Sequence, residues 1–523
     1  MKQPWMIARF LAAIALPSVS MQRLAGAVTV AMMVHMGATD AVAQTPPARA
    51  DAFPVAPDGP LRAVTTSHRI TTPRGAIAYR ATWFETVLRS PDGTPQATIS
   101  ATAYVRDGGD ANRPVALFFN GGPGVSSSSL HSTLFGPRRL GERDAAGKQE
   151  PGDNPDTLLD MADLLFIDPV GTGFSRPLRA DGGKPYWSFE GDAAAVLTLV
   201  REWLGANGRM ASPLFIAGES YGGYRLGVMA KAMDGLNVQG LILVSPLLDL
   251  AEPDDQQAIN RLPTMAVAAW HHRRRPDDRR TVDQVWQEAR AFAQSDYALA
   301  LQQGSALPAA ERAAMAARLA PLIGWPQSAI EAADLRVDLQ QFLETLVSGR
   351  IASRFDVRIA APEPAKPINP DRPDAGQDPL ITPAKSNFIV SQPMGDYLRN
   401  ELKVPTAREY YALAADVNFN WDWSPLTLVS GAAWSVTGNI AKLMRDRPQV
   451  RTLLIGGYYD LVIPLLGVRY AFTHNAVPLD RLSVVTLPSG HSALEGDTDK
   501  PRGMRVIRDF IAGKPDEGGM TFR

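Results

Sequence analysis

Residues 214–223 read Leu-Phe-Ile-Ala-Gly-Glu-Ser-Tyr-Gly-Gly, an apolar, strand-like run that leads into the pattern Gly-x-Ser-x-Gly. A helix-compatible segment, residues 224–233, follows directly. Small residues two positions on either side of Ser220 would let the chain turn sharply between a strand and a helix, with the serine hydroxyl exposed at the turn. The pattern therefore predicts a nucleophile elbow with Ser220 as the nucleophile. A glycine-rich turn that carries an ordinary serine is the alternative interpretation.

The segments around this elbow alternate between strand-like and helix-like patterns. Short, wholly apolar runs are typical of parallel strands that are covered on both faces, and helix-like segments such as residues 191–204 separate them. This alternation indicates an α/β sheet with right-handed crossovers. Upstream, residues 68–106 alternate apolar and polar positions, which predicts antiparallel strands. The expected parallel strands are residues 115–119, 163–168, 214–217 and 240–245, and the expected antiparallel strands are residues 76–83 and 96–105.

The sheet pattern stops after about Asp249. Residues 251–350 are rich in Ala, Gln, Arg and Glu and have helical periodicity, with helices expected at residues 281–301 and 309–322. A Pro-rich stretch, residues 362–383, follows, and we interpret it as a loop. The middle of the chain is therefore predicted to be a helical insertion into the sheet domain.

Strand patterns return near the C-terminus, at residues 451–455 and 482–487, and a final helix is expected at residues 504–512. This order predicts an α/β-hydrolase fold with a mostly parallel central sheet and a helical insertion that forms a lid. The predicted parts are a signal peptide at residues 1–43, the first part of the core at 44–250, the insertion with its Pro-rich loop at 251–424, and the second part of the core at 425–523.

The N-terminal segment has the features of a secretory signal peptide. Arg23 precedes the apolar run 24–33, and residues 41–43, Ala-Val-Ala, form a small-x-small cleavage site. A membrane anchor is the weaker interpretation, because His35 interrupts the run and a span needs roughly 20 apolar residues. Translation from Met21 would give a signal of ordinary length. We therefore expect an exported protein, periplasmic or secreted, with no membrane contact after cleavage.

The composition excludes several classes of function. The 523 residues include 53 basic and 54 acidic side chains, a formal net charge of −1, and no cysteine. This balance gives no global field that would draw the chain to nucleic acid or to an anionic membrane. Without cysteine there is no thiol nucleophile, no thiolate metal site and no disulfide, so the exported form depends on packing alone for its stability.

A basic run at residues 271–275 begins with two adjacent histidines. We interpret the run as a solvated face, because Asp277 and Asp278 balance its charge directly afterwards. Adjacent histidines on a helix point about 100° apart, and no carboxylate spacing completes a metal site with them. We predict no bound metal.

A serine nucleophile needs a base, and with this type of elbow the base comes last in the chain. Of the seven histidines, only His474 and His491 follow the elbow and lie outside the insertion. We select His491, because it follows an expected strand and Gly490 lets the backbone bring its ring over the serine. His474 lies in a helix-like segment, which is typical of a surface histidine.

Asp460 is the candidate for the acid that orients the base. It directly follows the expected strand at residues 451–455, at the sheet edge where such folds collect functional groups. A helix N-cap ahead of residues 461–470 is its alternative role, and one residue could serve both. The competing acids, which do not follow a buried strand so directly, are Asp416, Asp422, Asp446 and Asp480.

These residues predict acyl-transfer chemistry. His491 would take the proton of Ser220 as the hydroxyl attacks an acyl carbon, and Asp460 would fix the imidazole tautomer. The oxyanion hole needs two backbone N–H groups, of which Tyr221 supplies one. The second comes from the glycine-rich loop after residues 115–119, where we choose Gly122.

Several segments together resemble the serine carboxypeptidase family (peptidase family S10). Residues 120–127 are similar to its Asn-Gly-Gly-Pro-Gly-Cys-Ser-Ser motif, and residues 168–175 to Asp-x-Pro-Val-Gly-x-Gly-Phe-Ser, one residue shorter. Residues 218–223 resemble Gly-Glu-Ser-Tyr-Ala-Gly, and the surroundings of Asp460 and His491 match the family's Asp and His blocks. The resemblance covers the α/β core on both sides of the insertion, and it implies an exported bacterial carboxypeptidase that needs no metal or organic cofactor.

The resemblance also implies peptide substrates with a free C-terminus. In the family, the Asn of the first motif and the Glu before the nucleophile bind the terminal carboxylate, and these positions are Asn120 and Glu219 here. Because two carboxylates held close together cannot both ionise cheaply, the arrangement implies a protonated Glu219 with a raised pKa. A buried carboxyl that only supports the elbow is the alternative role for Glu219.

Three positions depart from the family pattern. Val125 replaces the Cys of the first motif, Leu134 stands where the family has a second acidic residue, and Ser492 replaces the Met after the histidine. Leu134 leaves the carboxylic acid pair incomplete. This weakens the prediction of exopeptidase activity and of an acidic pH optimum more than it weakens the prediction of acyl-transfer chemistry. An esterase or acyltransferase with the same triad is therefore one alternative, and a non-catalytic periplasmic binding protein is the second. The oligomeric state stays open.

Overall fold

The computed structural model describes residues 53–514, apart from residue 111 and residues 142–143, 145–148, 275–277, 363–377, 381–386, 425–434 and 497–498. The predicted signal peptide lies outside the described residues, as does most of the Pro-rich stretch. Both interpretations stay predictions.

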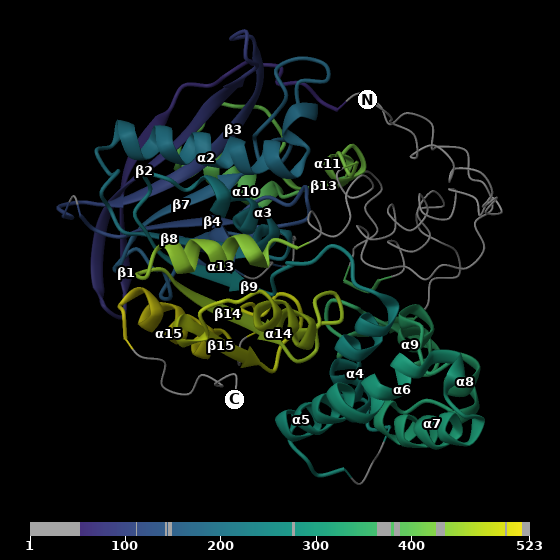
Figure 1. Cartoon of the computed structure of the whole chain (residues 1–523). Coiled ribbons are helices and arrows are strands. Elements are labelled where there is room, and N and C mark those ends of the chain that lie inside the picture. Colours follow the sequence, from purple (N-terminus) through teal and green to yellow (C-terminus); the bar gives the residue numbers. More distant parts are fainter. Residues whose placement is uncertain are drawn as a thin grey trace, which may run out of the picture.

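A nine-stranded sheet forms the centre of the molecule (Figure 1). Its first strands pair antiparallel as far as β7, and every later neighbour pair is parallel. The chain therefore has an α/β-hydrolase fold with a mostly parallel sheet, as the sequence predicts. In sheet order, the strands are β1 (Val64–Thr72), β2 (Gly75–Arg89), β3 (Pro95–Arg106), β7 (Asp163–Asp168), β4 (Val115–Phe119), β8 (Leu214–Glu219), β9 (Val238–Val244), β14 (Arg451–Gly457) and β15 (Leu482–Leu487).

Burial along the strands follows the two sequence patterns. Strands β4, β7 and β8 are buried at every residue, because the parallel part of the sheet is covered on both faces. In β1, by contrast, every second residue over most of the strand is exposed, so the antiparallel edge has a solvated face. The expected strands at residues 76–83 and 96–105 lie inside the longer β2 and β3.

Helices pack on both faces of the sheet, each set around its own apolar cluster. Helices α2 and α13 lie over the sheet in Figure 1. The helices of the first face are α2 (Phe189–Ala206), α3 (Tyr221–Met229), α13 (Thr437–Asp446) and α14 (Leu465–His474). Those of the second face are the π-helix η1 (Leu130–Phe135), α10 (Gln392–Asp396) and α15 (Lys500–Ile511).

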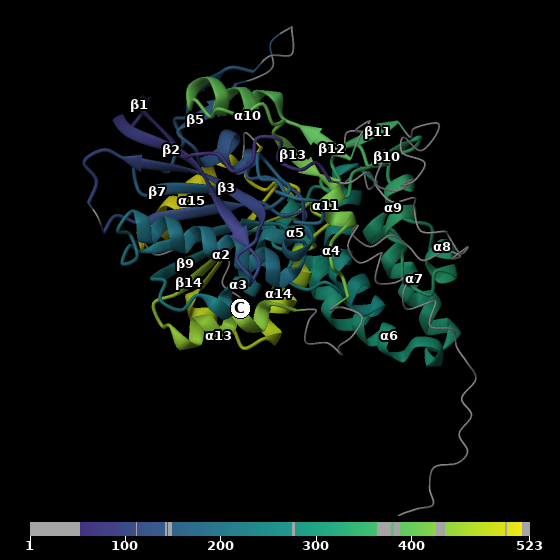
Figure 2. The same cartoon turned by 90° about the horizontal axis from the view of Figure 1, so that it is seen from above.

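A group of helices, which we call the helical body, projects from the sheet domain (lower right in Figure 1, right in Figure 2). Its apolar cluster contains the fully buried Trp286 and Phe342 together with Tyr459 and Leu461. The helical body therefore packs against the chain that follows β14. Its helices are α4 (Asp254–His271), α5 (Val282–Phe292), α6 (Ala298–Gln303), α7 (Ala309–Ile323), α8 (Gln327–Ala332) and α9 (Leu339–Thr345).

Residues 388–419 fall in the predicted insertion range but pack against the sheet domain instead of the helical body. Met394 and Tyr410, for example, are fully buried in the apolar cluster of the second face. Their elements have five residues or fewer, which is too short for periodicity to reveal them. They are β12 (Phe388–Val390), α10, the π-helix η6 (Tyr397–Glu401), β13 (Tyr411–Ala414) and α11 (Ala415–Phe419).

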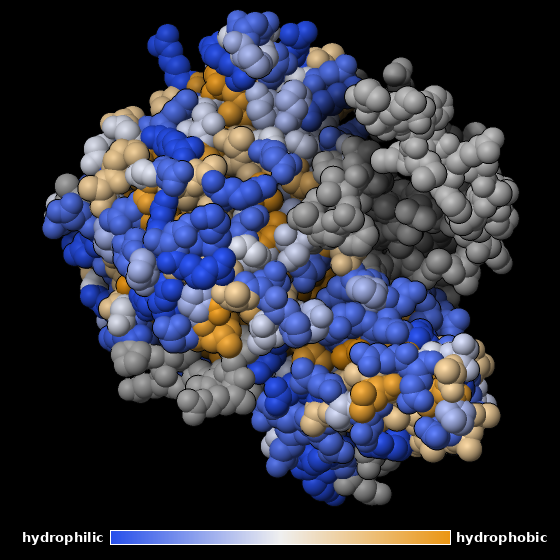
Figure 3. Space-filling view, in the orientation of Figure 1, coloured by the Kyte–Doolittle hydropathy of each residue, from blue (hydrophilic) through white to orange (hydrophobic). Residues whose placement is uncertain are grey.

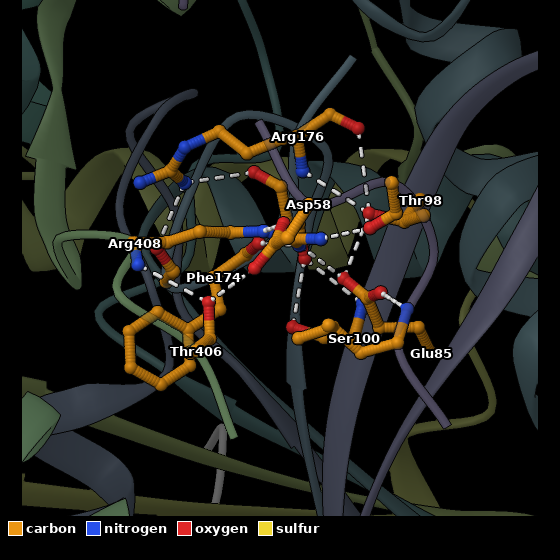
Figure 4. A network of polar contacts seen from close by, with 12 residues as sticks. Asp58, Glu85, Thr98, Ser100, Phe174, Arg176, Thr406 and Arg408 are labelled. Carbon is orange, nitrogen blue, oxygen red and sulfur yellow. Dashed lines mark hydrogen bonds and ion pairs between the residues drawn. The ribbon is translucent and has the colours of Figure 1, made fainter. Parts of the chain in front are cut away.

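Arg408 ties this stretch to the sheet through a buried polar network (Figure 4). Its guanidinium donates to Asp58 Oδ1 (2.6 Å), Glu85 Oε1 (2.5 Å) and the carbonyl of Phe174 (2.7 Å). The side chains of Arg408 and Glu85 are 1% and 0% exposed. Because a buried charge is tolerated only when it is paired and hydrogen-bonded, the network holds the N-terminal segment, β2 and the start of β13 in one arrangement.

The face drawn in Figure 3 is largely polar, and its apolar residues form separate, smaller areas. Within the described parts of the chain, no helix combines the length and the apolar character needed to cross a bilayer.

Candidate active site

Ser220 stands at the turn between β8 and α3, where the sequence predicts a nucleophile elbow. Its backbone φ of 58° and ψ of −126° are strained for a residue with a side chain. A Cβ at Gly218 would lie 2.5 Å from the carbonyl oxygen of Gly222, and a Cβ at Gly222 would lie 3.1 Å from that of Phe119. The contact at Gly218 leaves no room for a side chain, whereas the contact at Gly222 is tight, and both favour small residues on either side of Ser220.

Asp460 and His491 form a buried pair beyond the ends of β14 and β15. The distance from His491 Nδ1 to Asp460 Oδ2 is 2.8 Å, and the two residues are 8% and 1% exposed. Burial alone would lower the pKa of His491, but the charge and hydrogen bond of Asp460 outweigh it and raise that pKa. The arrangement can hold an imidazole in one tautomer and stabilise it when protonated.

The structure also shows where the alternative base, His474, lies and whether Asp460 has the alternative role of a helix N-cap. His474 is exposed at the end of α14, where its Nδ1 lies 2.9 Å from the carbonyl oxygen of Tyr470. Asp460 does not cap α14, because that helix begins at Leu465 with Pro464 as its N-cap. Its Oδ1 instead accepts hydrogen bonds from the backbone N–H groups of Val462 and Ile463, which fixes the carboxylate toward His491.

The glycine-rich loop after β4 passes directly over the elbow. A Cβ at Gly121 would lie 2.5 Å from the backbone nitrogen of Tyr221 and 2.9 Å from the Cβ of Ser220. The loop can approach Ser220 this closely only without a side chain at that position. Gly122 and Tyr221, the two predicted oxyanion donors, are therefore in neighbouring backbone segments beside Ser220.

A buried ion pair, which sequence reasoning missed, holds the glycine-rich loop in place. Arg225 Nε donates to Asp192 Oδ2 at 2.6 Å, and Arg225 Nη1 donates to the carbonyl of Asn120 at 2.5 Å. Both side chains are almost completely buried. The ion pair links α2, α3 and the glycine-rich loop after β4, and its charges give no motif because they lie on two separate helices.

Asn120 and Glu219 lie together beside the elbow. Asn120 Nδ2 donates to Ser129 Oγ at 2.9 Å and has a long contact of 3.4 Å to Glu219 Oε2, while its Oδ1 accepts from the Gly121 N–H at 2.7 Å. Burial raises the pKa of Glu219 to about 8, and the charge of Glu495 adds to the rise. Glu219 is therefore a neutral acid at neutral pH, able to donate a hydrogen bond.

Leu134, where the resemblance places a second acid, is part of the apolar core. It is 1% exposed and belongs to the apolar cluster of the second face with Phe135. The second acidic charge near Glu219 comes instead from Glu495, an exposed side chain in the turn that follows His491. Lys500, in the same region, donates to the carbonyl of Thr133 at 3.0 Å, which holds this turn beside η1. In the sequence, only its position four residues after His491 could have indicated that Glu495 lies near the site.

Residues 354–358, which follow the helical body, contact both loops of the Asp–His pair. The backbone N–H of His491 donates to the carbonyl of Phe355 at 2.6 Å, and that of Leu461 donates to the carbonyl of Arg354 at 2.9 Å. Arg358 Nη1 donates to the carbonyl of Pro488 at 2.6 Å, and its guanidinium lies 4.8 Å from the ring centre of Tyr459. This bridging segment is built largely from backbone contacts, so no residue pattern revealed it.

The two adjacent histidines lie near this bridging segment rather than at a separate site. His271 is exposed, and its ring centre lies 5.6 Å from that of Tyr459. His272 Nε2 lies 2.7 Å from the carbonyl oxygen of Val357. Across the described residues, no group of three or more His, Asp or Glu side chains is arranged to hold a metal ion.

Comparison with known proteins relates one segment of the chain to a family. The family model described as serine carboxypeptidase, Peptidase S10, matches residues 104–273, which include the elbow and the glycine-rich loop after β4. A pheromone-processing carboxypeptidase KEX1 from Podospora anserina is 33% identical over 126 residues, 24% of this chain and 20% of the relative. Serine carboxypeptidase-like 36 from Arabidopsis thaliana is 31% identical over 156 residues, 27% of this chain and 30% of the relative.

A solved structure extends the likeness beyond the matched segment. The crystal structure of Kex1(Δ)p, a prohormone-processing carboxypeptidase from Saccharomyces cerevisiae, has a TM-score of 0.53 at 16% identity and covers 84% of this chain and 93% of that chain. At this identity the likeness shows the fold. The chain thus has an α/β-hydrolase fold, and the matched segment supports the serine carboxypeptidase family that the sequence motifs indicate. The segments matched in the two curated relatives above are less than a third of their length.

Proposed function

We propose that the protein is a serine carboxypeptidase that removes C-terminal residues from peptides through an acyl-enzyme on Ser220. The observation that carries the proposal is Glu219, a buried acid with a pKa raised to about 8, directly beside the elbow and in contact with Asn120. A neutral carboxyl next to a nucleophile can bind a substrate carboxylate without repelling it. An ionised Glu219 would exclude that ligand.

In this proposal the triad is Ser220, Asp460 and His491. His491 accepts the Ser220 proton as the hydroxyl attacks the scissile carbonyl, and Asp460 stabilises the resulting imidazolium through its 2.8 Å contact with Nδ1. The backbone N–H groups of Gly122 and Tyr221 hold the oxyanion. The proton then passes from His491 to the leaving amine, and water hydrolyses the acyl-enzyme by the same steps in reverse order.

Glu219 and Asn120 select the substrate by its free C-terminus. The Glu219 carboxyl and the Asn120 Nδ2 donate to the terminal carboxylate of the leaving residue, while burial, and next to it the charge of Glu495, raises the pKa of Glu219 and favours its protonated form. Glu495, which lies in another loop, thereby acts as the second acid of the pair in place of the residue that Leu134 replaces. The helical body and residues 354–358 act as the lid and outer wall of the site, and export to the periplasm or the medium fits the predicted signal peptide.

A matched pair of substrates tests the proposal. A blocked dipeptide with a free C-terminus should be hydrolysed at least about 100-fold faster at pH 6.5 than the same compound with a C-terminal amide, because the amide offers Glu219 and Asn120 no charge. Equal rates would favour the alternative esterase or acyltransferase with the same triad. Failure of a fluorophosphonate to label Ser220 would favour the non-catalytic binding protein.

A further inference from the structure

A pocket opens from Ser220, and the residues that line it differ from those proposed to hold the terminal carboxylate. Gly122, Pro123 and Ser220 form one part of the pocket wall. The other lining residues belong to the loop after β9, the first half of α4 and residues 461–471. Among the described residues, Asn120 and Glu219 do not line it. If the leaving residue is held by Asn120 and Glu219, as the proposed function states, this pocket receives the side chain on the acyl side of the scissile bond, the P1 side chain.

The pocket combines apolar walls with a small set of polar groups. Gln257, Asn260 and Arg261 share one face of α4, because they are three and four positions apart. The apolar lining includes Leu247, Leu248, Val462 and Ile463, and the acidic lining consists of Asp249 and Glu252.

Both acids of the pocket already have hydrogen-bond partners. The two oxygens of Glu252 lie 3.0 and 3.1 Å from Asn260 Nδ2, and the carboxyl of Asp249 is hydrogen-bonded by Ser435. Burial raises the pKa of each carboxyl, and Asp249 raises that of Glu252 further. Burial therefore disfavours the charged form of both acids.

Arg261 is different, because no described residue forms a hydrogen bond or an ion pair with its half-buried side chain. Glu252, Asp338 and Asp254 attract the guanidinium from a distance and Arg354 repels it, while burial lowers its pKa. A guanidinium keeps its charge in proteins. A cation withdrawn from water without hydrogen-bond acceptors is unfavourable until a ligand supplies them.

We propose that Arg261 makes this pocket a receptor for an acidic P1 side chain, aspartate or glutamate. A carboxylate can accept two parallel N–H bonds from a guanidinium, and the apolar walls would strengthen that pair by excluding water. An acidic P1 residue brings the acceptors that Arg261 lacks, whereas a basic one would place a second cation beside it.

Three blocked dipeptides with the same C-terminal residue and Glu, Gln or Leu at P1 test this proposal by their kcat/KM values at pH 6.5. The wild-type enzyme should prefer Glu over Gln by at least about tenfold. Arg261→Met should reduce this ratio to about one while keeping the Leu substrate within about threefold, and Arg261→Glu should favour Gln over Glu. Gln257→Leu, which changes a neutral residue of the same pocket, should leave the Glu-to-Gln ratio unchanged. A wild-type ratio of one or less, or a ratio unaffected by Arg261→Met, overturns the proposal.

A binding measurement separates this inference from the proposed function. N-acetylglutamate, the product that such a cleavage would leave, should bind the wild-type protein more tightly than N-acetylglutamine in calorimetry, and Arg261→Met should abolish the difference. This preference without any peptide hydrolysis would refute the carboxypeptidase while leaving the anion pocket in place. Peptide hydrolysis without the preference would refute the anion pocket alone.

Discussion

The elbow and the Asp–His pair are positioned by two different kinds of contact. At the elbow, a Cβ at Gly218 would lie 2.5 Å from the carbonyl oxygen of Gly222, four residues further on, so this part of the motif contains its own geometric cause. The loops of Asp460 and His491 are instead bridged by residues 354–358, about a hundred positions earlier in the chain. A nucleophile can thus be recognised from local sequence, whereas the alignment of its base depends on contacts that leave no motif.

Removal of the nucleophile should have the largest effect. Ser220→Ala should reduce kcat on a blocked dipeptide by on the order of 10⁴- to 10⁶-fold, because the acyl-enzyme can no longer form. The backbone strain at residue 220 stays, so thermal unfolding should change little. A variant that keeps even a tenth of the wild-type rate would show that the elbow is not the catalytic centre.

Arg408 tests the packing of the stretch that returns to the sheet. Arg408→Met should lower the free energy of unfolding by about 3–5 kcal/mol, because it leaves the buried Glu85 carboxylate without its cation. The matched control is Lys442→Met, which removes an exposed helical ion pair with Asp446 and should cost less than about 0.5 kcal/mol. Equal urea midpoints for both variants would mean that the network does not hold this stretch in place.

Substitution of Arg358 tests whether the bridging segment aligns His491, and it should have a smaller effect on catalysis than Ser220→Ala. Arg358→Met should lower kcat by about three- to tenfold with KM nearly unchanged, because it removes the hydrogen bond to Pro488 in the loop of His491. Arg358→Lys should recover part of the loss. Arg280→Met is the control, since Arg280 pairs only with Asp278 and Glu288 among the described residues. A rise in KM with kcat unchanged would place Arg358 in substrate binding instead of alignment.

Much of the fold could be predicted because its signals are local or periodic. The buried strands β4, β7, β8 and β9 appear as short apolar runs, and the helical body appears in the helical periodicity after Asp249. Chain order then selected His491, and the position directly after an expected strand selected Asp460; the structure brings the two within 2.8 Å of each other.

The remaining features depend on residues that meet only in the folded chain. Residues 388–419 were assigned to the insertion range because their short elements have no readable period, although their buried side chains pack against the sheet domain. Glu495 could not be linked to Glu219, because one lies in a turn after His491 and the other ends β8. Arg261 belongs to an amphipathic helix in which its sequence position gives no functional signal, and only its place in the pocket beside Ser220 identifies it as a candidate binding residue.

The central claim is that a protonated Glu219 recognises the free C-terminus of the substrate. The most direct test is the pH dependence of kcat/KM for a blocked dipeptide in the wild-type enzyme and in Glu219→Gln. Because burial raises the pKa of Glu219 to about 8, the wild-type value should fall about tenfold per pH unit above that pH. Glutamine does not ionise, so the variant should lack this alkaline decline. An identical decline in both proteins would contradict the role of Glu219.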